Sequence, residues 1–180
     1  MVKAIKVMLI PNNVQKTKLF QYAGASRFAY NWALAREIEN YEKGGKFLSD
    51  AELRKEFTKL RRSDEYAWLL SISNNVTKQA IKDACTAYKN FFKGLQKFPR
   101  FKSKKRAMPK FYTYTDPPVQ SVKGYSRIHI FSICRNSSIF CKSYPIHFLF
   151  VGFPAGGKAF KFNVGITESY LNVVLIELRH

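Results

Sequence analysis

The chain has 180 residues, an apolar fraction of 46% and a formal net charge of +19. This length suits one ordinary domain or two small ones, and the apolar fraction is sufficient for a hydrophobic core. A charge of this size costs stability through self-repulsion unless a polyanion neutralises it, so we expect a nucleic acid partner ahead of an anionic membrane or an acidic protein.

The positive charge is concentrated in the first part of the chain. Residues 1–110 carry 24 Lys and Arg against 9 Asp and Glu, whereas residues 111–180 carry 7 against 3. The apolar run from Ile146 to Phe153 is too short for a membrane span, and the N-terminus does not resemble a signal peptide. Three cysteines without a secretory signal favour a reduced, cytoplasmic protein.

The N-terminal segment predicts a strand followed by a helix. Lys3 to Ile10 alternates partly and is rich in β-branched residues, and Pro11 should stop the strand. Asn12 and Asn13 are suited to cap a helix that begins near them.

Apolar residues at spacings of three and four continue this helix. They form two rows: Ala25, Phe28, Trp32 and Ala35, then Tyr30, Leu34, Ile38 and Tyr41. We expect Gly24 to interrupt the helix and Gly44-Gly45 to end it.

Two further helices are predicted before residue 95. The capping-box pattern from Ser49 to Glu52 predicts the start of the first, whose outer face is expected to include Arg61. Ser73 or Asn74 should cap the second. Its apolar stripe comprises Val76, Ala80, Ala84, Ala87 and Phe91. We expect three aromatic residues of the helical part in the core: Phe28, Trp32 and Tyr88.

After Phe111 the composition changes to short runs rich in Tyr, Thr, Val, Ile and Phe, which predicts several strands. The expected organisation is a first strand in 1–12, a helical lobe in 13–95, a basic loop in 96–110, and a β-rich part in 111–180 that is atypical at 131–160.

The segment from Lys89 to Arg106 holds eight basic residues, four phenylalanines and no acid. Phosphates bind Lys and Arg, and aromatic rings stack on unpaired bases, so the combination suits a nucleic acid. The residues predicted to contact phosphate are Lys97, Arg100, Lys102, Lys104, Lys105 and Arg106. Phe98 and Phe101 are either core anchors or stacking rings, and both alternatives stay open at this point.

Several short motifs resemble the TnpB (OrfB) family of insertion-sequence transposase-associated proteins, which are related to the type V CRISPR effectors. They are GASRFAYNWAL from Gly24, WL at Trp68, AYKNFF from Ala87 and FPRFKSKKR from Phe98. Their order and spacing are similar to the N-terminal half of that family across roughly residues 1–115.

Members of that family are RNA-guided DNA endonucleases. The resemblance implies an α+β fold, in which a helical recognition lobe with helix-turn-helix character is inserted in an oligonucleotide-binding-like β barrel. It implies that the basic loop faces guide RNA, and that the chain is associated with the nucleoid. Four more residues are implied to lie near a DNA motif beside the target: Ser49, Asp50, Asn74 and Lys78.

The sequence departs from the family after residue 111. The chain ends at His180, before the position where a RuvC-type nuclease domain begins in the family. Two-metal cleavage needs converging acids, and only Asp116, Glu168 and Glu177 occur in this part, widely dispersed. We therefore expect binding of RNA and DNA without cleavage, with no catalytic residue, metal site or cofactor. The spacing of Cys134 and Cys141 does not match a usual zinc site.

Two alternatives remain beside this interpretation. One is a stand-alone helix-turn-helix DNA-binding regulator, and the other is a decayed transposase product with no activity. Residues 131–160, rich in Phe, Ser and Cys, fit either a local frameshift or a genuine insertion.

Overall fold

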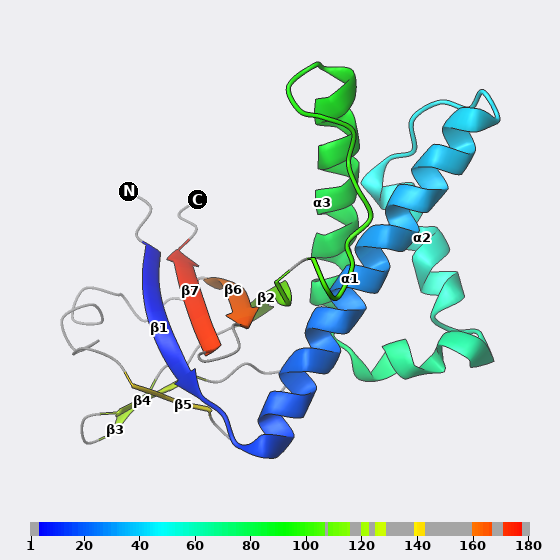
Figure 1. Ribbon diagram of the computed structural model, residues 1–180. Helices are drawn as coiled ribbons and strands as arrows, with labels where there is room; N and C mark the ends of the chain where they lie inside the picture. The colour runs from blue at the N-terminus through cyan, green and yellow to red at the C-terminus, as the bar shows by residue number, and fades with distance from the viewer. Residues whose placement is uncertain are drawn as a thin grey trace. The chain divides into compact units, whose positions relative to one another are not determined.

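The computed structural model describes residues 4–106, 108–115, 120–122, 125–128, 139–142, 160–166 and 171–177. The elements follow in the order β1 (Ala4–Ile10), α1 (Asn13–Glu42), α2 (Asp50–Leu60), the 3₁₀ helix η1 (Asp64–Ser71), α3 (Asn74–Phe92), β2 (Lys110–Thr115), β3 (Gln120–Val122), β4 (Tyr125–Ile128), β5 (Ile139–Lys142), β6 (Phe160–Ile166) and β7 (Leu171–Glu177). Figure 1 labels the α-helices and the strands. The chain divides into two units, which are Tyr22–Ala107 and the flanking segments Met1–Gln21 and Met108–His180.

The strands of the flanking unit form one antiparallel sheet in the order β2-β6-β7-β1-β5-β4-β3. The strand β1 is central: it pairs with β7 along Ala4–Leu9 and with β5 along Met8–Ile10. In Figure 1, β1 (blue) lies beside β7 (red), although the two are far apart in the sequence. The β-branched composition of both strands suits such a ladder.

The predicted fold class was wrong. A barrel closes only when its first and last strands pair. Here β2 and β3 stand at opposite ends of the strand order, so the described strands form an open sheet rather than an oligonucleotide-binding-like barrel. The strands β3, β4 and β5 have only three or four residues each, which gives few ladder bonds for closure. The part of the chain with described side chains is instead mostly helical.

The helix α1 begins with a reciprocal cap. The Asn12 Oδ1 atom accepts a hydrogen bond from the Gln15 N–H at 2.8 Å, and the Asn12 N–H donates to Gln15 Oε1 at 3.0 Å. The helix ends at Glu42, followed by Gly44 at a positive φ of 73°. The predicted cap and end are therefore confirmed, but the predicted interruption at Gly24 is wrong, because α1 runs through it without a break.

Replacing Gly24 with Ala should raise the free energy of unfolding by about 0.5–1 kcal/mol, since glycine is a poor residue inside a helix. A Cβ atom at this position meets nothing within 4 Å beyond the helix's own neighbouring backbone. Urea unfolding followed by circular dichroism measures the change. The matched control is Gly44→Ala, which should destabilise because of its positive φ. A Gly24→Ala midpoint at or below that of the unchanged chain would contradict the expectation.

The next two helices begin as the sequence predicts. The Ser49 hydroxyl accepts from the Glu52 N–H at 3.2 Å, and the Glu52 carboxylate accepts from the Ser49 N–H at 2.7 Å, which completes a capping box. The hydroxyl of Ser73 accepts from the Asn75 N–H at 3.4 Å at the start of α3. Both caps satisfy backbone donors that would otherwise lack a partner.

Two aromatic clusters pack in the helical unit. The first comprises Phe28, Trp32, Phe57, Tyr66 and Trp68. The second joins the ends of α1 and α3 with the segments that follow them, and comprises Tyr41, Phe47, Tyr88, Phe91, Phe92 and Phe98. The predicted core position of Tyr88 is confirmed, whereas Phe28 and Trp32 are only partly buried.

None of the helices in the described part of the chain is long and apolar enough to cross a membrane.

Candidate nucleic-acid interface

The basic segment, defined as residues 97–106, presents most of its charge to solvent. Five of its six cations are exposed: Lys97, Arg100, Lys104, Lys105 and Arg106. Among the described residues, none of these five forms an ion pair, whereas Arg36, Lys43 and Arg54 of the helices do. These charges are consequently available to an anionic ligand.

The sixth cation, Lys102, is fastened to α1. The side-chain amide of Asn31 donates from Nδ2 to the Lys102 carbonyl at 2.9 Å and accepts the Lys102 N–H on Oδ1 at 2.8 Å. The Lys102 ammonium lies 3.4 Å from the centroid of the Tyr30 ring, a cation–π contact. Burial of Tyr30 is the main cause that raises the pKa of its hydroxyl, so the ring stays neutral. These contacts fix the middle of the basic segment on α1 and leave the lysines after it in solvent.

The structure separates the two phenylalanines that the sequence left undecided. The ring centroid of Phe98 lies 5.1 Å from that of Phe91 and 6.1 Å from that of Tyr88, so Phe98 packs on the second aromatic cluster while 45% of it stays exposed. Phe101 is 54% exposed and has no ring contact within the described residues. Pro99, which lies between them, is buried.

The four residues implied to lie near DNA are found at or near the starts of two helices. Ser49 and Asp50 begin α2, and their side chains are engaged there: Asp50 Oδ2 accepts from Arg54 Nη2 at 2.7 Å. Asn74 and Lys78 lie one turn apart on α3 and are both exposed. Within the described residues, no hydrogen bond joins the Ser49–Asp50 pair to Asn74 or Lys78.

Sequence reasoning missed Arg61, which was expected on the outer face of α2 and is 7% exposed. Its Nη2 atom donates to the carbonyls of Leu69 at 2.8 Å and Ile72 at 3.0 Å, and its Nη1 atom donates to Asn74 Oδ1. Burial lowers the pKa of the guanidinium. The signal was the spacing of four from Leu53 through Phe57 to Arg61, which places the arginine on the buried face. Arg61 thereby holds the start of α3 against η1.

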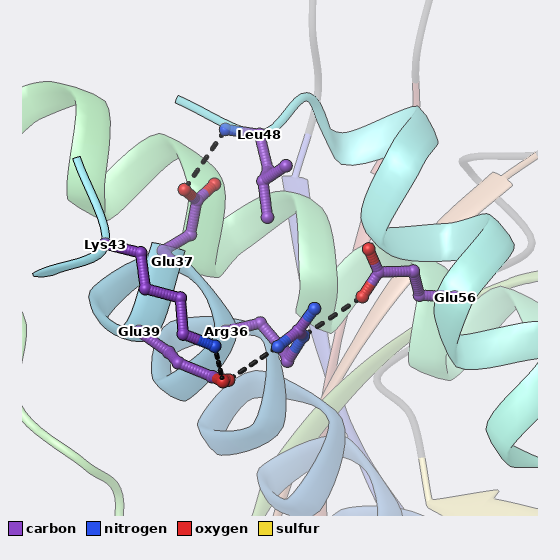
Figure 2. A network of polar contacts seen from close by, with 6 residues as sticks. All are labelled: Arg36, Glu37, Glu39, Lys43, Leu48 and Glu56. Carbon is purple, nitrogen blue, oxygen red and sulfur yellow. Dashed lines mark hydrogen bonds and ion pairs between the residues drawn. The ribbon is translucent and has the colours of Figure 1, made fainter. Parts of the chain in front are cut away.

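Glu37, in α1, is a second buried charge that the sequence did not reveal, with an exposed fraction of 1%. Its Oε2 atom accepts from the Leu48 N–H at 3.3 Å, and its Oε1 atom has no hydrogen-bond partner (Figure 2). Burial raises the pKa of this carboxyl to about 7, against smaller lowering effects of the Leu48 hydrogen bond and the Lys89 charge. The carboxyl therefore ties the segment after α1 to the helix.

The neighbouring charges in Figure 2 are paired, and they are exposed at Lys43 and partly exposed at Arg36, Glu39 and Glu56. Arg36 donates from Nε to Glu56 Oε2 at 3.0 Å and from Nη1 to Glu39 Oε2 at 2.5 Å. Lys43 reaches the other oxygen of Glu39 at 2.6 Å. Hydrogen bonds from Lys43 and Arg36 lower the pKa of Glu39, the opposite of the shift at Glu37. Exposed pairs of this kind contribute little to stability.

The described residues contain no group of three or more His, Cys, Asp or Glu that could hold a metal ion. The side chains of Cys134 and Cys141 lie outside the described ones, as do the acids Asp116, Glu168 and Glu177. Of the atypical stretch 131–160, only β5 and Phe160 are described.

The comparisons with known proteins agree on one part of the chain. Residues 1–46 match the OrfB IS605 family of helix-turn-helix domains. InsQ of Escherichia coli (strain K12), named as a candidate RNA-guided DNA endonuclease, is 36% identical over 102 residues, which are 57% of this chain and 25% of that protein. A Streptomyces pristinaespiralis protein, similarly named, is 29% identical over 105 residues, 58% of this chain and 26% of that protein. The chain thus spans about a quarter of the length of these curated relatives.

Proposed function

The N-terminal part of this chain is related to the TnpB (OrfB) family, as its motifs predicted, and on that premise we propose that the chain binds nucleic acid through its basic segment. The observation that carries the proposal is the set of five exposed cations without carboxylate partners among the described residues. Each phosphate that such a cation neutralises releases counterions, which drives binding. The proposal assigns binding to this chain and no cleavage step.

The ligands that we propose are a guide-like RNA and the DNA beside its target, which would associate the chain with the nucleoid. The names of both relatives support this choice, since each is called RNA-guided. The RNA would lie along the basic segment, with Lys102 already positioned by Asn31. For the DNA, exposed Lys78 on α3 is better placed than the other three residues, whose side chains are engaged. Ser49 and Asp50 are bonded within α2, and Asn74 accepts a hydrogen bond from Arg61.

The test replaces Lys104, Lys105 and Arg106 together with Ala in the full chain. The logarithm of the binding constant falls linearly with the logarithm of the salt concentration, by about 0.7 to 0.9 per phosphate contact. The triple substitution should therefore flatten this slope by about 2–3 units, for single-stranded RNA and for duplex DNA. Fluorescence anisotropy across a salt series measures the slope.

The matched control removes three exposed cations of α2 instead, Lys55, Lys59 and Arg62. The net charge changes equally, so a contact-based effect should appear only in the first variant. Equal salt slopes for both variants would show that binding depends on the net charge of the chain and not on its location, and would overturn the proposed interface. Failure of the unchanged chain to bind either ligand at low salt would overturn the function itself.

A DNA-binding regulator remains the second candidate, because the matched family is described as a helix-turn-helix domain. A helix-turn-helix places its second helix in the major groove. The described residues of the matched range hold β1 and the unbroken α1, so two helices joined by a turn do not both lie inside it. In the same titrations, a regulator would bind duplex DNA more tightly than RNA.

A further inference from the structure

An aromatic patch at the carboxyl ends of α1 and α3 leaves large apolar groups in water. Its members are Tyr41, Phe47, Phe92, Leu95 and Phe98, with exposed fractions of 59%, 38%, 52%, 70% and 45%. The rings are linked through the buried Tyr88: the centroids of Tyr41 and Phe92 lie 5.4 Å apart, and the centroid of Tyr88 lies 5.1 Å from Phe92, 6.3 Å from Phe47 and 6.1 Å from Phe98. Contiguous apolar surface of this kind marks an interaction site more often than isolated exposed residues do.

The surroundings of the aromatic patch are basic. Four exposed lysines lie beside its rings in the chain or in space: Lys46, Lys89, Lys93 and Lys97. The Lys89 ammonium is 4.7 Å from the centroid of the Phe47 ring. The acid next to the patch in the chain is Glu42, which adjoins Tyr41. Flat rings among cations match a ligand that carries both π faces and negative charge.

We propose that the aromatic patch stacks on unpaired bases of a single-stranded nucleic acid, whose phosphates the four lysines contact. The inference rests on the proposed function and adds the class of ligand, a single strand. Bases in a duplex already stack on one another, so only unpaired bases offer their faces to protein rings. A purely apolar partner would leave the lysines unmatched. Phe98 belongs to both the patch and the basic segment, and Lys97 of that segment adjoins it in the chain, so one strand can follow both.

The experiment compares the full chain with a Tyr41→Leu, Phe92→Leu variant. Leucine keeps an apolar side chain but lacks the flat ring, so the folded helices should be retained while stacking is lost. Binding of a mixed-sequence single-stranded RNA should weaken about fivefold or more. Binding of a duplex of equal length should not change, and neither should the salt slope, because no charge has been removed.

The matched control is Trp68→Leu. Trp68 is 48% exposed in the other aromatic cluster, and the acids Asp64 and Glu65 precede it in the same 3₁₀ helix. This variant should bind single strands as the unchanged chain does. An equal loss in both variants, or an equal loss for duplex and single strand, would overturn the inference while leaving the proposed function in place. Absence of any binding by the unchanged chain would overturn both.

A measurement on the unchanged chain guards against a variant that fails to fold. A single strand that carries 2-aminopurine loses emission when the analogue stacks on an aromatic ring, so binding should quench it. Unquenched emission in a saturated complex would contradict stacking. Sedimentation tests the alternative that a second copy of the chain occupies the patch. If the unchanged chain is a dimer, and the double substitution converts it to a monomer with unchanged RNA affinity, the patch is a contact between copies and the inference is overturned.

Discussion

Replacing Arg61 with Met should lower the free energy of unfolding by about 1–3 kcal/mol, the usual cost of a buried carbonyl that loses its donor. The substitution removes the side-chain donor of the Ile72 carbonyl, whereas the Leu69 carbonyl keeps the Ile72 N–H at 3.1 Å. Burying the charged guanidinium is itself unfavourable, as the lowered pKa of Arg61 indicates. The variant no longer buries this charge, and that gain offsets part of the cost. Urea unfolding followed by helical circular dichroism measures the difference.

Two control variants test whether the loss of stability comes from the hydrogen bonds of Arg61. Arg62→Met removes an exposed arginine at the next position and should change stability by less than about 0.5 kcal/mol. Arg61→Lys keeps the charge but lacks the planar fork that reaches both carbonyls, so it should fall between the other two. If the two methionine variants unfold at the same urea concentration, the hydrogen bonds of Arg61 are not what holds η1 to α3.

Replacing Glu37 with Gln should stabilise the chain at alkaline pH and have little effect in acid. The pKa of Glu37 is raised to about 7 from an ordinary 4.5, so the native state favours the neutral carboxyl. Its contribution to stability is complete below the unfolded pKa and is lost as the pH rises through the folded pKa. The variant keeps an acceptor for the Leu48 N–H but never carries a buried charge. Its advantage should grow by about 2–3 kcal/mol between about pH 5 and about pH 8.

The matched control for Glu37 lies two residues along the same helix. Glu39 is partly exposed, and its hydrogen bonds and ion pairs with Lys43 and Arg36 lower its pKa, so its contribution to stability is present above the unfolded pKa and is lost as the pH falls through the folded pKa. Glu39→Gln should therefore give the opposite trend, and only in acid. Parallel unfolding curves of the unchanged chain and Glu37→Gln across this pH range would show that Glu37 is not buried as a neutral group.

Local sequence signals were sufficient to predict the helices, whereas the fold class depends on contacts between residues far apart in the sequence, which local patterns do not encode. The capping box at Ser49 involves residues three apart, so its residue types alone predict it. The open sheet depends on β1 pairing with β7, across most of the chain, and the resemblance suggested a closure that the described strands do not make. At Gly24 the packing and propensity of the rest of α1 outweighed one unfavourable residue.

The candidate interface also has features that local sequence predicts and features that only the structure reveals. Exposed lysines such as Lys104 follow from a charged run without apolar periodicity, and the structure agrees with that. The contact of Asn31 with Lys102 joins residues 71 positions apart, so no spacing rule could find it. Charged residues are rarely buried without partners, so the sequence alone favours exposed positions for Arg61 and Glu37. Predicting their burial requires knowing which element covers each helix face.

The central place of β1 in the sheet has a consequence for the newly made polypeptide. This strand is synthesised well before its neighbour β7, which ends at Glu177, so at about 5–20 residues per second it waits on the order of ten seconds for that partner. The helical unit is contiguous from Tyr22 to Ala107 and meets all its own helices much earlier. Synthesis therefore separates the two units in time: the helices can be complete while an apolar N-terminal strand is still unpaired and open to chaperones.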